Sequence, residues 1–481
     1  RKKAGDERKG AGAGAGQGIR RPMATAEEPA DIPHQEDATH SQDGSADSPS
    51  HQANGQHPHH AETDEFQKFE TSEKGEAENE ILSAWMCEED SLYAELTQVR
   101  DQGWQDEQFG AVWDRRKQIF SNRDIRGRGA TGHFDHVASY YDSYRVGMPN
   151  LAFYEPKETR ELPRNACVLE FGAAPGGAVK FWCEDCRAKV TGITLPPHMH
   201  GMQMVYRNKQ SINLLWDDLS TEDAFERLKP VIQRSLEEHR AGGGRHHHGR
   251  GGDVPLFDVV HHGAIIHRGQ QDVVTKEDDQ QRNYRMRLTR NVYRLALTFL
   301  REGGHMLLVM TLRYQDLLML SLFLPLFEDF QVFRTSFRVN SRFRILLKYH
   351  RPFAKDRKQW GPRKVFQFFQ TMTADFDATW GSHPDRFNLE VAMDVFRQLR
   401  PKMKDLWQDQ LDFLKWLQRK ARKAKCDQDI TDLALLLVGG AASGIDFSVH
   451  DDDSNEEGGE GGRAAASEEH ADQRDSDEAG T

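Results

Sequence analysis

The segment that restricts the fold most strongly is a short apolar run that ends in a glycine-rich turn. It spans residues 167–177 with the sequence C-V-L-E-F-G-A-A-P-G-G, and a helical pattern begins near Ala178. A strand, a glycine-rich turn and a helix N-terminus together form a nucleotide-type pocket, because glycine lets the backbone approach a ligand closely. The alternative is an ordinary tight turn of an α/β protein. The strand before the turn and the helix after it favour the ligand site.

Seven short apolar runs between residues 166 and 350 alternate with helical patterns. This alternation is typical of a parallel sheet with crossover helices, and it predicts a doubly wound α/β domain. The expected strands are residues 167–171, 189–195, 212–216, 257–262, 305–312, 330–339 and 342–350. Residues 241–253 read A-G-G-G-R-H-H-H-G-R-G-G-D and are predicted to be a flexible insert outside the core.

Helical patterns flank this domain, which we place at residues 133–364. Apolar residues at helical spacing predict two amphipathic helices in an N-terminal extension, residues 76–132. A C-terminal helical region is expected over residues 365–445. Within it we predict one helix over residues 387–399, a new helix that starts at Pro401, and a last apolar helix over residues 430–438.

Both ends of the chain are predicted to be disordered. Residues 1–75 are rich in polar residues and have almost no branched apolar side chains to bury, so they cannot offset the entropy lost on ordering. Residues 446–481 carry thirteen acids and two arginines. This tail supplies most of the formal net charge of −12, so the folded middle is only mildly acidic.

The five cysteines predict a reduced intracellular protein without a disulfide framework, in the nucleus or the cytoplasm. Cys183 and Cys186 share a helix face, but no second pair completes a zinc site, so we expect core thiols and no bound metal. The longest apolar runs stay below the roughly 18 residues that a membrane span needs, so no membrane partner is expected.

The glycine-rich segment resembles the S-adenosylmethionine motif of the FtsJ/RrmJ ribose methyltransferases, which reads aspartate and then Leu-Gly-Ala-Ala-Pro-Gly-Gly. The resemblance implies a Rossmann-type seven-stranded methyltransferase sheet with S-adenosylmethionine as cofactor. It also implies that residues of the turn line the methionine side of the cofactor, namely Glu170, Gly172, Ala173, Pro175, Gly176 and Gly177. Asp217 and Asp218, after the third strand, lie where the family contacts the adenine amino group. Their alternative role is a helix N-cap pair.

The catalytic Lys-Asp-Lys-Glu tetrad of this family is not preserved. Its positions fall on Leu151, His262, Val309 or Met310, and Phe343, and the nearest lysine to the first of them is Lys157. Of the residues at the four positions, only His262 can accept a proton, and an imidazole normally titrates at pH 6–7. We therefore expect His262 to be the candidate general base, the alternative being a loop histidine in a histidine-rich chain.

A basic strip covers residues 331–364, where eleven lysines and arginines face one aspartate and are interleaved with aromatic residues. Such a strip can pair with phosphates while its aromatic rings stack on bases, so Arg342, Arg344 and Lys348 are candidate RNA-binding residues. The alternative is a half-buried strand pair with one solvated basic face.

Together these features predict an S-adenosylmethionine-dependent methyltransferase of FtsJ-like type that acts on RNA ribose. Two alternatives remain open at this point. One is a catalytically inactive protein that binds S-adenosylmethionine or RNA, and the other is a methyltransferase of a small molecule or a protein. Possible protein partners are not indicated by the sequence.

Overall fold

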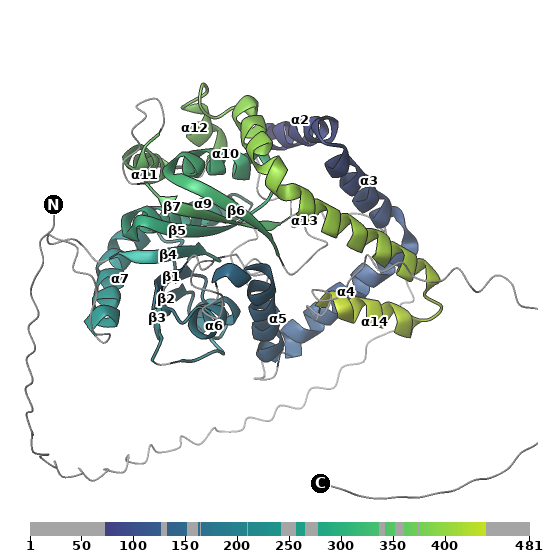
Figure 1. Cartoon of the computed structure of the whole chain (residues 1–481), viewed down its shortest axis with the longest axis horizontal. Helices are drawn as coiled ribbons and strands as arrows, with labels where there is room; N and C mark the ends of the chain where they lie inside the picture. The colour runs from purple at the N-terminus through teal and green to yellow at the C-terminus, as the bar shows by residue number, and fades with distance from the viewer. Residues whose placement is uncertain are drawn as a thin grey trace, which may run out of the picture. The chain divides into compact units, whose positions relative to one another are not determined.

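The computed structural model describes residues 73–126, 132–151, 162–163, 165–208, 210–241, 256–264, 278–335, 342–351, 360–373 and 375–438 (Figure 1). The segments predicted to be disordered, residues 1–75 and 446–481, lie outside this set except for residues 73–75. The predicted insert, residues 241–253, lies outside it except for Ala241.

Seven strands form a single sheet in the order β3-β2-β1-β4-β5-β7-β6 (Figure 1). The strands are β1 (Cys167–Phe171), β2 (Lys189–Thr194), β3 (Ile212–Trp216), β4 (Phe257–His262), β5 (Leu300–Met310), β6 (Phe327–Arg334) and β7 (Phe343–His350). The neighbours among β1 to β5 pair in parallel. The predicted fold class, an α/β fold with a seven-stranded sheet and flanking helices, is confirmed.

The last two strands differ from the purely parallel arrangement that the alternating pattern predicts. Strand β7 runs antiparallel to both β5 and β6, with Met310 opposite Phe343 and Phe330 opposite Leu347. Only residues 335–342 connect β6 to β7. A parallel crossover needs a dozen or more residues, so this short connection permits only a hairpin.

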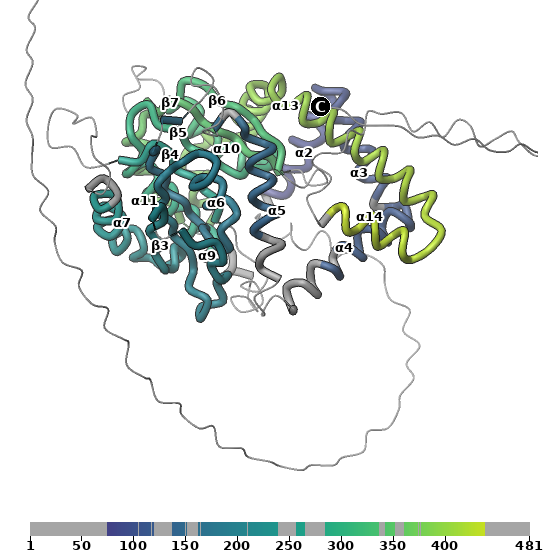
Figure 2. The backbone as a smooth tube through the Cα atoms, turned by 60° about the horizontal axis from the view of Figure 1, so that its bottom comes forward, coloured from purple at the N-terminus to yellow at the C-terminus, as the bar shows by residue number. Residues whose placement is uncertain are grey.

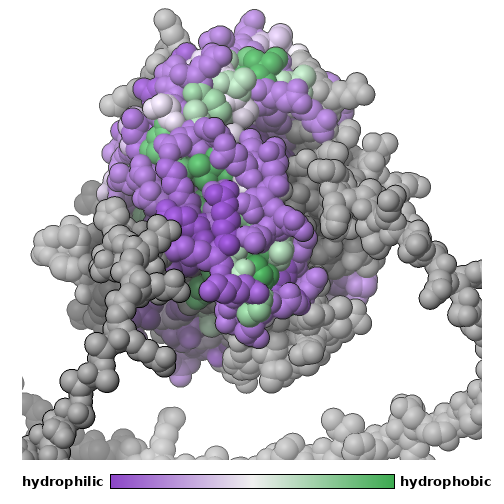
Figure 3. All heavy atoms as spheres, turned by 90° about the vertical axis from the view of Figure 1, so that its right-hand side faces the viewer, coloured by the Kyte–Doolittle hydropathy of each residue, from purple (hydrophilic) through white to green (hydrophobic). Residues whose placement is uncertain are grey.

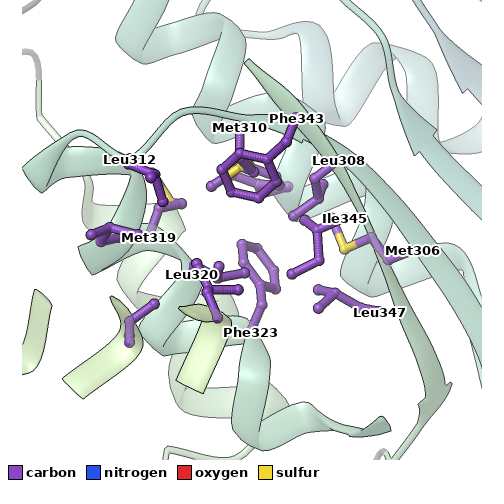
Figure 4. Packing of buried hydrophobic residues seen from close by; sticks show 14 of the residues in the cluster. Met306, Leu308, Met310, Leu312, Met319, Leu320, Phe323, Phe343, Ile345 and Leu347 are labelled. Atoms are coloured by element: carbon purple, nitrogen blue, oxygen red, sulfur yellow. The ribbon is translucent and has the colours of Figure 1, made fainter. Parts of the chain in front are cut away.

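Helices cover both faces of the sheet. One face packs against α5 (Gly132–Gly147) and α6 (Gly177–Glu184), which lie side by side (Figure 2). The other face packs against α7 (Ala224–Ala241), α9 (Asp278–Phe299), α10 (Tyr314–Phe323) and α11 (Pro362–Thr371). Figure 4 shows the dense apolar core between α10 and the strands β5 and β7. The short helix α12 (Phe376–Gly381) follows α11.

The N-terminal extension contains more helices than the sequence pattern predicts. Instead of two, the structure has α2 (Glu73–Glu89), α3 (Ser91–Gln105) and α4 (Glu107–Arg126) before α5. The break between α2 and α3 lies at Asp90, whose carboxylate accepts hydrogen bonds from the backbone N–H groups of Leu92 and Tyr93. Asp90 is therefore an N-cap, which starts a new helix within a continuous apolar pattern.

The expected helix break at Pro401 is wrong. Helix α13 runs without interruption from Leu389 to Lys423, with Pro401 inside it. The buried residues Leu399, Met403 and Trp407 continue one apolar face across the proline. A proline inside a helix costs about 3 kcal/mol, and burial of this face offsets that cost.

The N-terminal and C-terminal helices pack against each other, as α3 and α13 do in both Figure 1 and Figure 2. The ring of Tyr93 lies 5.2 Å from that of Trp407, and Lys415 of α13 pairs with Glu95 of α3 at 2.5 Å. The last helix, α14 (Asp427–Val438), packs on α4.

The face shown in Figure 3 is largely hydrophilic, with hydrophobic residues in small patches. Within the described ranges, no helix has both the length and the apolar character to cross a membrane.

Candidate functional site

The glycine turn, residues 172–177, lies at the carboxyl edge of the parallel strands. The backbone N–H groups of Gly172 and Ala173 donate to the carbonyl of Ile193 at the end of β2, at 2.8 and 3.2 Å. Gly172 and Gly176 have φ values of +81° and +114°, which favour glycine over other residues. The carboxyl edge of such a sheet is where α/β proteins bind ligands, so the turn stands in the predicted place.

Each glycine of this turn is also required by the packing of the chain itself. A Cβ on Gly172 would lie 2.6 Å from Cα of Ala264, and one on Gly176 would lie 2.7 Å from Cβ of Tyr206. A Cβ on Gly177 would collide with Tyr140 of α5. The sequence pattern assigned these glycines to a ligand, whereas part of their role is to let neighbouring segments of the protein approach.

Glu170, predicted to contact the cofactor, is instead enclosed by protein side chains. It is 1% exposed, and its carboxylate accepts hydrogen bonds from Nε1 of Trp182 at 2.8 Å and from Nδ1 of His261 at 2.7 Å. Because a carboxylate can only accept, Nδ1 of His261 carries the proton. In the neutral imidazole, Nε2 then accepts a hydrogen bond from the hydroxyl of Tyr144, whose oxygen lies 3.2 Å away.

This buried chain of hydrogen bonds continues to strand β7 through Tyr144 and Arg344. The guanidinium carbon of Arg344 lies 3.9 Å from the centre of the Tyr144 ring, and Nη2 donates to Oγ of Ser143 at 2.8 Å. Burial raises the pKa of Tyr144, so its hydroxyl stays protonated. We call these four side chains the buried polar chain: Glu170, His261, Tyr144 and Arg344. They connect β1, β4, α5 and β7.

The two acids after β3 have partners within their own segment. Asp217 accepts two hydrogen bonds from Arg227, at 2.6 and 3.1 Å, and this pairing raises the pKa of Arg227. Asp218 accepts hydrogen bonds from the backbone N–H and the hydroxyl of Ser220, at 2.8 and 2.6 Å. Neither acid is the helix N-cap that the sequence left as the alternative, because α7 begins only at Ala224. The adenine contact stays a prediction.

His262 and His261 are adjacent in β4 but point to opposite faces of the sheet. The ring of His262 lies 5.2 Å from that of Tyr293 of α9, at 75°. Burial, together with the neighbouring His261, lowers the pKa of His262 to about 3. Its imidazole is therefore neutral at every ordinary pH, and the expected titration at pH 6–7 is wrong. Its role as a general base stays a prediction.

The other positions of the family's tetrad are apolar in this chain and lie in or against its cores. Leu151 is 1% exposed and packs in the same cluster as Tyr144. Phe343 is buried in the core shown in Figure 4, beside Met310. Val309 lies on β5 opposite Arg344, and Lys157 lies outside the described residues. At the described positions of the tetrad, His262 is therefore the one residue that can titrate.

The three candidate RNA-binding residues differ in exposure. Arg342 is exposed, but Arg344 is 3% exposed within the buried polar chain. Lys348 is also buried, and its ammonium lies 3.1 Å from Asp329. Burial of Asp329 acts the other way, yet hydrogen bonds from Lys402 and Lys348 lower the pKa of this carboxyl to about 2. Two of the three cations are therefore held by the protein. RNA binding stays a prediction, and Arg342 is the one of these three residues that is exposed to an RNA ligand.

Cys183, in α6, and Cys186, two residues after the end of α6, both lie in the core, although the sequence placed them on one helix face. Cys183 and Cys186 are both buried, and burial raises the pKa of the Cys183 thiol to about 12. None of the five cysteines, all of which are described, forms a disulfide. Among the residues that the structure describes, no cluster of three or more His, Cys, Asp or Glu side chains could hold a metal ion.

Comparisons with known proteins place the chain in no family. No protein-family model and no curated protein matches it. Among solved structures, a protein assigned as a ribosomal RNA methyltransferase from Plasmodium falciparum is similar with a TM-score of 0.26 and 12% identity, over 39% of this chain and 88% of that one. Human methyltransferase-like protein 13, in complex with SAH, is similar with a TM-score of 0.21 and 12% identity, over 56% and 91%.

Proposed function

We propose that this chain binds S-adenosylmethionine at the glycine turn and transfers methyl groups to RNA ribose poorly or not at all. The observation that supports the cofactor is the first turn of α6. Its N-cap is Gly176, which has no side-chain cap, and the N–H groups of Gly177, Ala178 and Val179 have no acceptor in the described part of the chain. A helix N-terminus with free N–H groups suits an anion such as the carboxylate of the methionine moiety.

The side chains fit the cofactor less well than the backbone does. Glu170, Asp217 and Asp218 all have partners within the protein, so none of these carboxylates is free for the contacts that the resemblance implies. The proposal therefore depends on the backbone of the turn. When bound, the cofactor would supply an electrophilic methyl group, and we assign no residue to its adenosine part.

The residues at the tetrad positions argue against efficient transfer to ribose. A ribose hydroxyl is a very weak acid, and a positioned general base contributes about 10²- to 10⁴-fold to such a reaction. Leu151, Val309 and Phe343 cannot accept a proton. An inactive cofactor-binding protein of methyltransferase fold is thus the function that the site supports best.

One observation keeps methyl transfer as a second candidate. His262 is neutral, and its Nδ1 is buried with no hydrogen-bond partner among the described residues. A neutral imidazole can accept a proton from a substrate that approaches this nitrogen, but a pKa of about 3 makes His262 a weak base, so transfer through it should be slow. Methyl transfer to an RNA substrate that is lost in His262→Ala, while cofactor binding persists, would favour this candidate over the inactive one.

Calorimetric titration with S-adenosylmethionine and S-adenosylhomocysteine tests the cofactor proposal. Ala178→Glu places a carboxylate in the first turn of α6, where it suits the helix dipole but repels a bound anion, and Ala178→Gln is the matched neutral control. We expect binding by the wild type and the glutamine variant, and at least about tenfold weaker binding by the glutamate variant. Absence of binding, or equal affinity in all three proteins, would refute the proposal. Gly176→Val is a poor test because its side chain would collide with Tyr206.

A further inference from the structure

Strand β3 forms one edge of the sheet, and no other strand of the described ranges pairs with its outer side (Figure 1). All five of its residues are at least partly exposed, whereas all five residues of β1 are buried. The strand reads Ile-Asn-Leu-Leu-Trp and contains no charged residue, proline or glycine. Its last residue, Trp216, is 43% exposed. The chain therefore presents an apolar strand edge at its surface.

The backbone groups that β3 leaves unpaired follow from its pairing with β2. In a parallel ladder, alternate residues of a strand direct both their N–H and their C=O toward the same neighbour. The carbonyl of Ser211 and the N–H of Asp217 both bond to β2, at 2.7 and 3.0 Å. The odd-numbered residues therefore face β2, whereas Ile212, Leu214 and Trp216 direct their backbone groups outward.

One of these outward groups is used within the chain. The N–H of Ile212 donates to the carbonyl of Asn208 at 2.9 Å. No hydrogen bond joins the outward N–H and C=O groups of Leu214 and Trp216 to another residue that the structure describes. Such an open row of donors and acceptors is a template for pairing with another strand.

The opposite edge of the sheet, strand β6, carries the protection that β3 lacks. Natural edge strands avoid uncontrolled pairing through charged side chains, above all lysine. Glu328 and Asp329 are exposed acids of β6. Lys402 of α13 donates to Asp329 and to the backbone carbonyl of Phe330. The contrast between the two edges indicates that β3 is paired in the assembled protein.

We propose that β3 pairs antiparallel with β3 of a second copy of this chain, which joins two seven-stranded sheets in a two-fold symmetric dimer. Two registers, centred on Leu214 or on Leu215, place outward-facing residues opposite each other. In either register the N–H groups of Leu214 and Trp216 gain acceptors on the partner strand. The exposed ring of Trp216 then packs on Ile212 or Leu214 of the partner subunit, as aromatic and aliphatic cross-strand pairs do.

The charges that flank β3 favour an antiparallel second copy as the occupant. Residues 203–211, before the strand, contain two basic residues and no acid, whereas residues 217–223, after it, contain four acids. Arg227 and Arg290 offset part of this acidic charge. Arg207 is exposed, and no ion pair joins it to another described residue. Because an antiparallel pair places the start of each strand beside the end of the other, the opposite charges meet twice at the interface.

The dimer goes beyond the proposed cofactor binding and does not require it. The free edge lies on the outer side of β3, whereas the glycine turn follows β1, and β2 separates these two strands. Failure of the dimer would therefore leave the cofactor proposal untouched, and the reverse also holds.

Sedimentation equilibrium of the full chain over a range of protein concentrations tests this inference. We expect a reversible equilibrium between monomer and dimer. Trp216→Lys places a lysine on the free edge twice in each dimer, so the dissociation constant of the dimer should rise by about tenfold or more. Leu435→Lys is the matched control, because Leu435 of α14 is 40% exposed and the change of charge is the same. It should dimerise like the wild type.

Hydrogen–deuterium exchange at two protein concentrations locates the interface without any substitution, and it gives the test if Trp216→Lys does not fold. Peptides that cover residues 212–217 should exchange more slowly above the dissociation constant of the dimer than below it, because the N–H groups of Leu214 and Trp216 gain acceptors. Peptides from residues 327–334 of β6 should not change. The inference is overturned by a chain that is monomeric at all concentrations or forms only larger aggregates, by a Trp216→Lys variant that dimerises like the wild type, by equal loss in the control, or by a dimer without slower exchange of residues 212–217.

Discussion

Nδ1 of His261 lies 2.7 Å from a carboxylate oxygen of Glu170, and the two side chains are 0% and 1% exposed. The pair joins the end of β1 to the neighbouring strand β4 directly beneath the glycine turn. Glu170, which the sequence predicts as a cofactor ligand, thus links β1 to β4, the two strands that end beneath the turn.

Replacing Glu170 with Gln should destabilise the protein. The carboxylate accepts from two donors, His261 and Trp182, whereas the amide has only one oxygen and adds two N–H donors that face other donors. We expect the free energy of unfolding to fall by about 1–3 kcal/mol, measured by chemical denaturation. Glu302→Gln, at an exposed residue of β5, is the control and should change little. Equal stability of the two variants would contradict the buried polar chain.

Replacing Arg344 or Lys348 with Gln should affect stability rather than RNA affinity. Both side chains are buried, Arg344 against Ser143 and Tyr144, and Lys348 against Asp329. Each substitution leaves a buried partner unsatisfied, so we expect a lower melting temperature in thermal denaturation. Normal melting temperatures, combined with weakened RNA binding that depends on salt, would show instead that these two side chains contact phosphates.

Stability should fall on acidification because His262 is protonated only in the unfolded chain. The pKa is about 3 in the folded state and 6.5 for an unperturbed histidine, so the unfolded state binds the extra proton between these values. Stability from this group is complete above pH 6.5 and is lost, at about 1.4 kcal/mol per pH unit, as the pH falls toward 3. Urea denaturation between pH 5 and 6.5 should show a shallower pH dependence for His262→Gln than for the wild type. Identical slopes would mean that the histidine is not buried as described.

Replacing Pro401 with Ala should stabilise the protein. Pro401 lies inside α13, where it cannot donate the backbone hydrogen bond that an alanine would restore. We expect an increase of about 1 kcal/mol or more in the free energy of unfolding, reduced somewhat by the greater freedom of the unfolded alanine chain. A loss of stability would indicate that the chain requires a break at this position, as the sequence pattern suggested.

The sequence predicted the sheet well because local patterns specify its strands. Each of the seven apolar runs is a strand, and the glycine turn lies at the expected strand end. Two helix boundaries failed. Asp90 caps a helix through local hydrogen bonds that the spacing of apolar residues does not register, and tertiary packing carries α13 through Pro401.

The site was predicted less completely because its partners are far apart in the chain. Glu170 and His261 are 91 residues apart, and Arg344 lies 201 residues from Ser143.

Hydrogen–deuterium exchange of the full chain, with and without S-adenosylhomocysteine, tests the central claim most directly. The backbone N–H groups of Gly177, Ala178 and Val179 are the donors that we assign to the ligand, so its binding should slow their exchange. Peptides from residues 389–423 in α13 serve as the internal reference and should exchange at unchanged rates. Slower exchange confined to the turn and the start of α6 is the predicted result. Unchanged exchange there at saturating ligand, or protection only in other segments, would contradict the assignment of the glycine turn as the cofactor site.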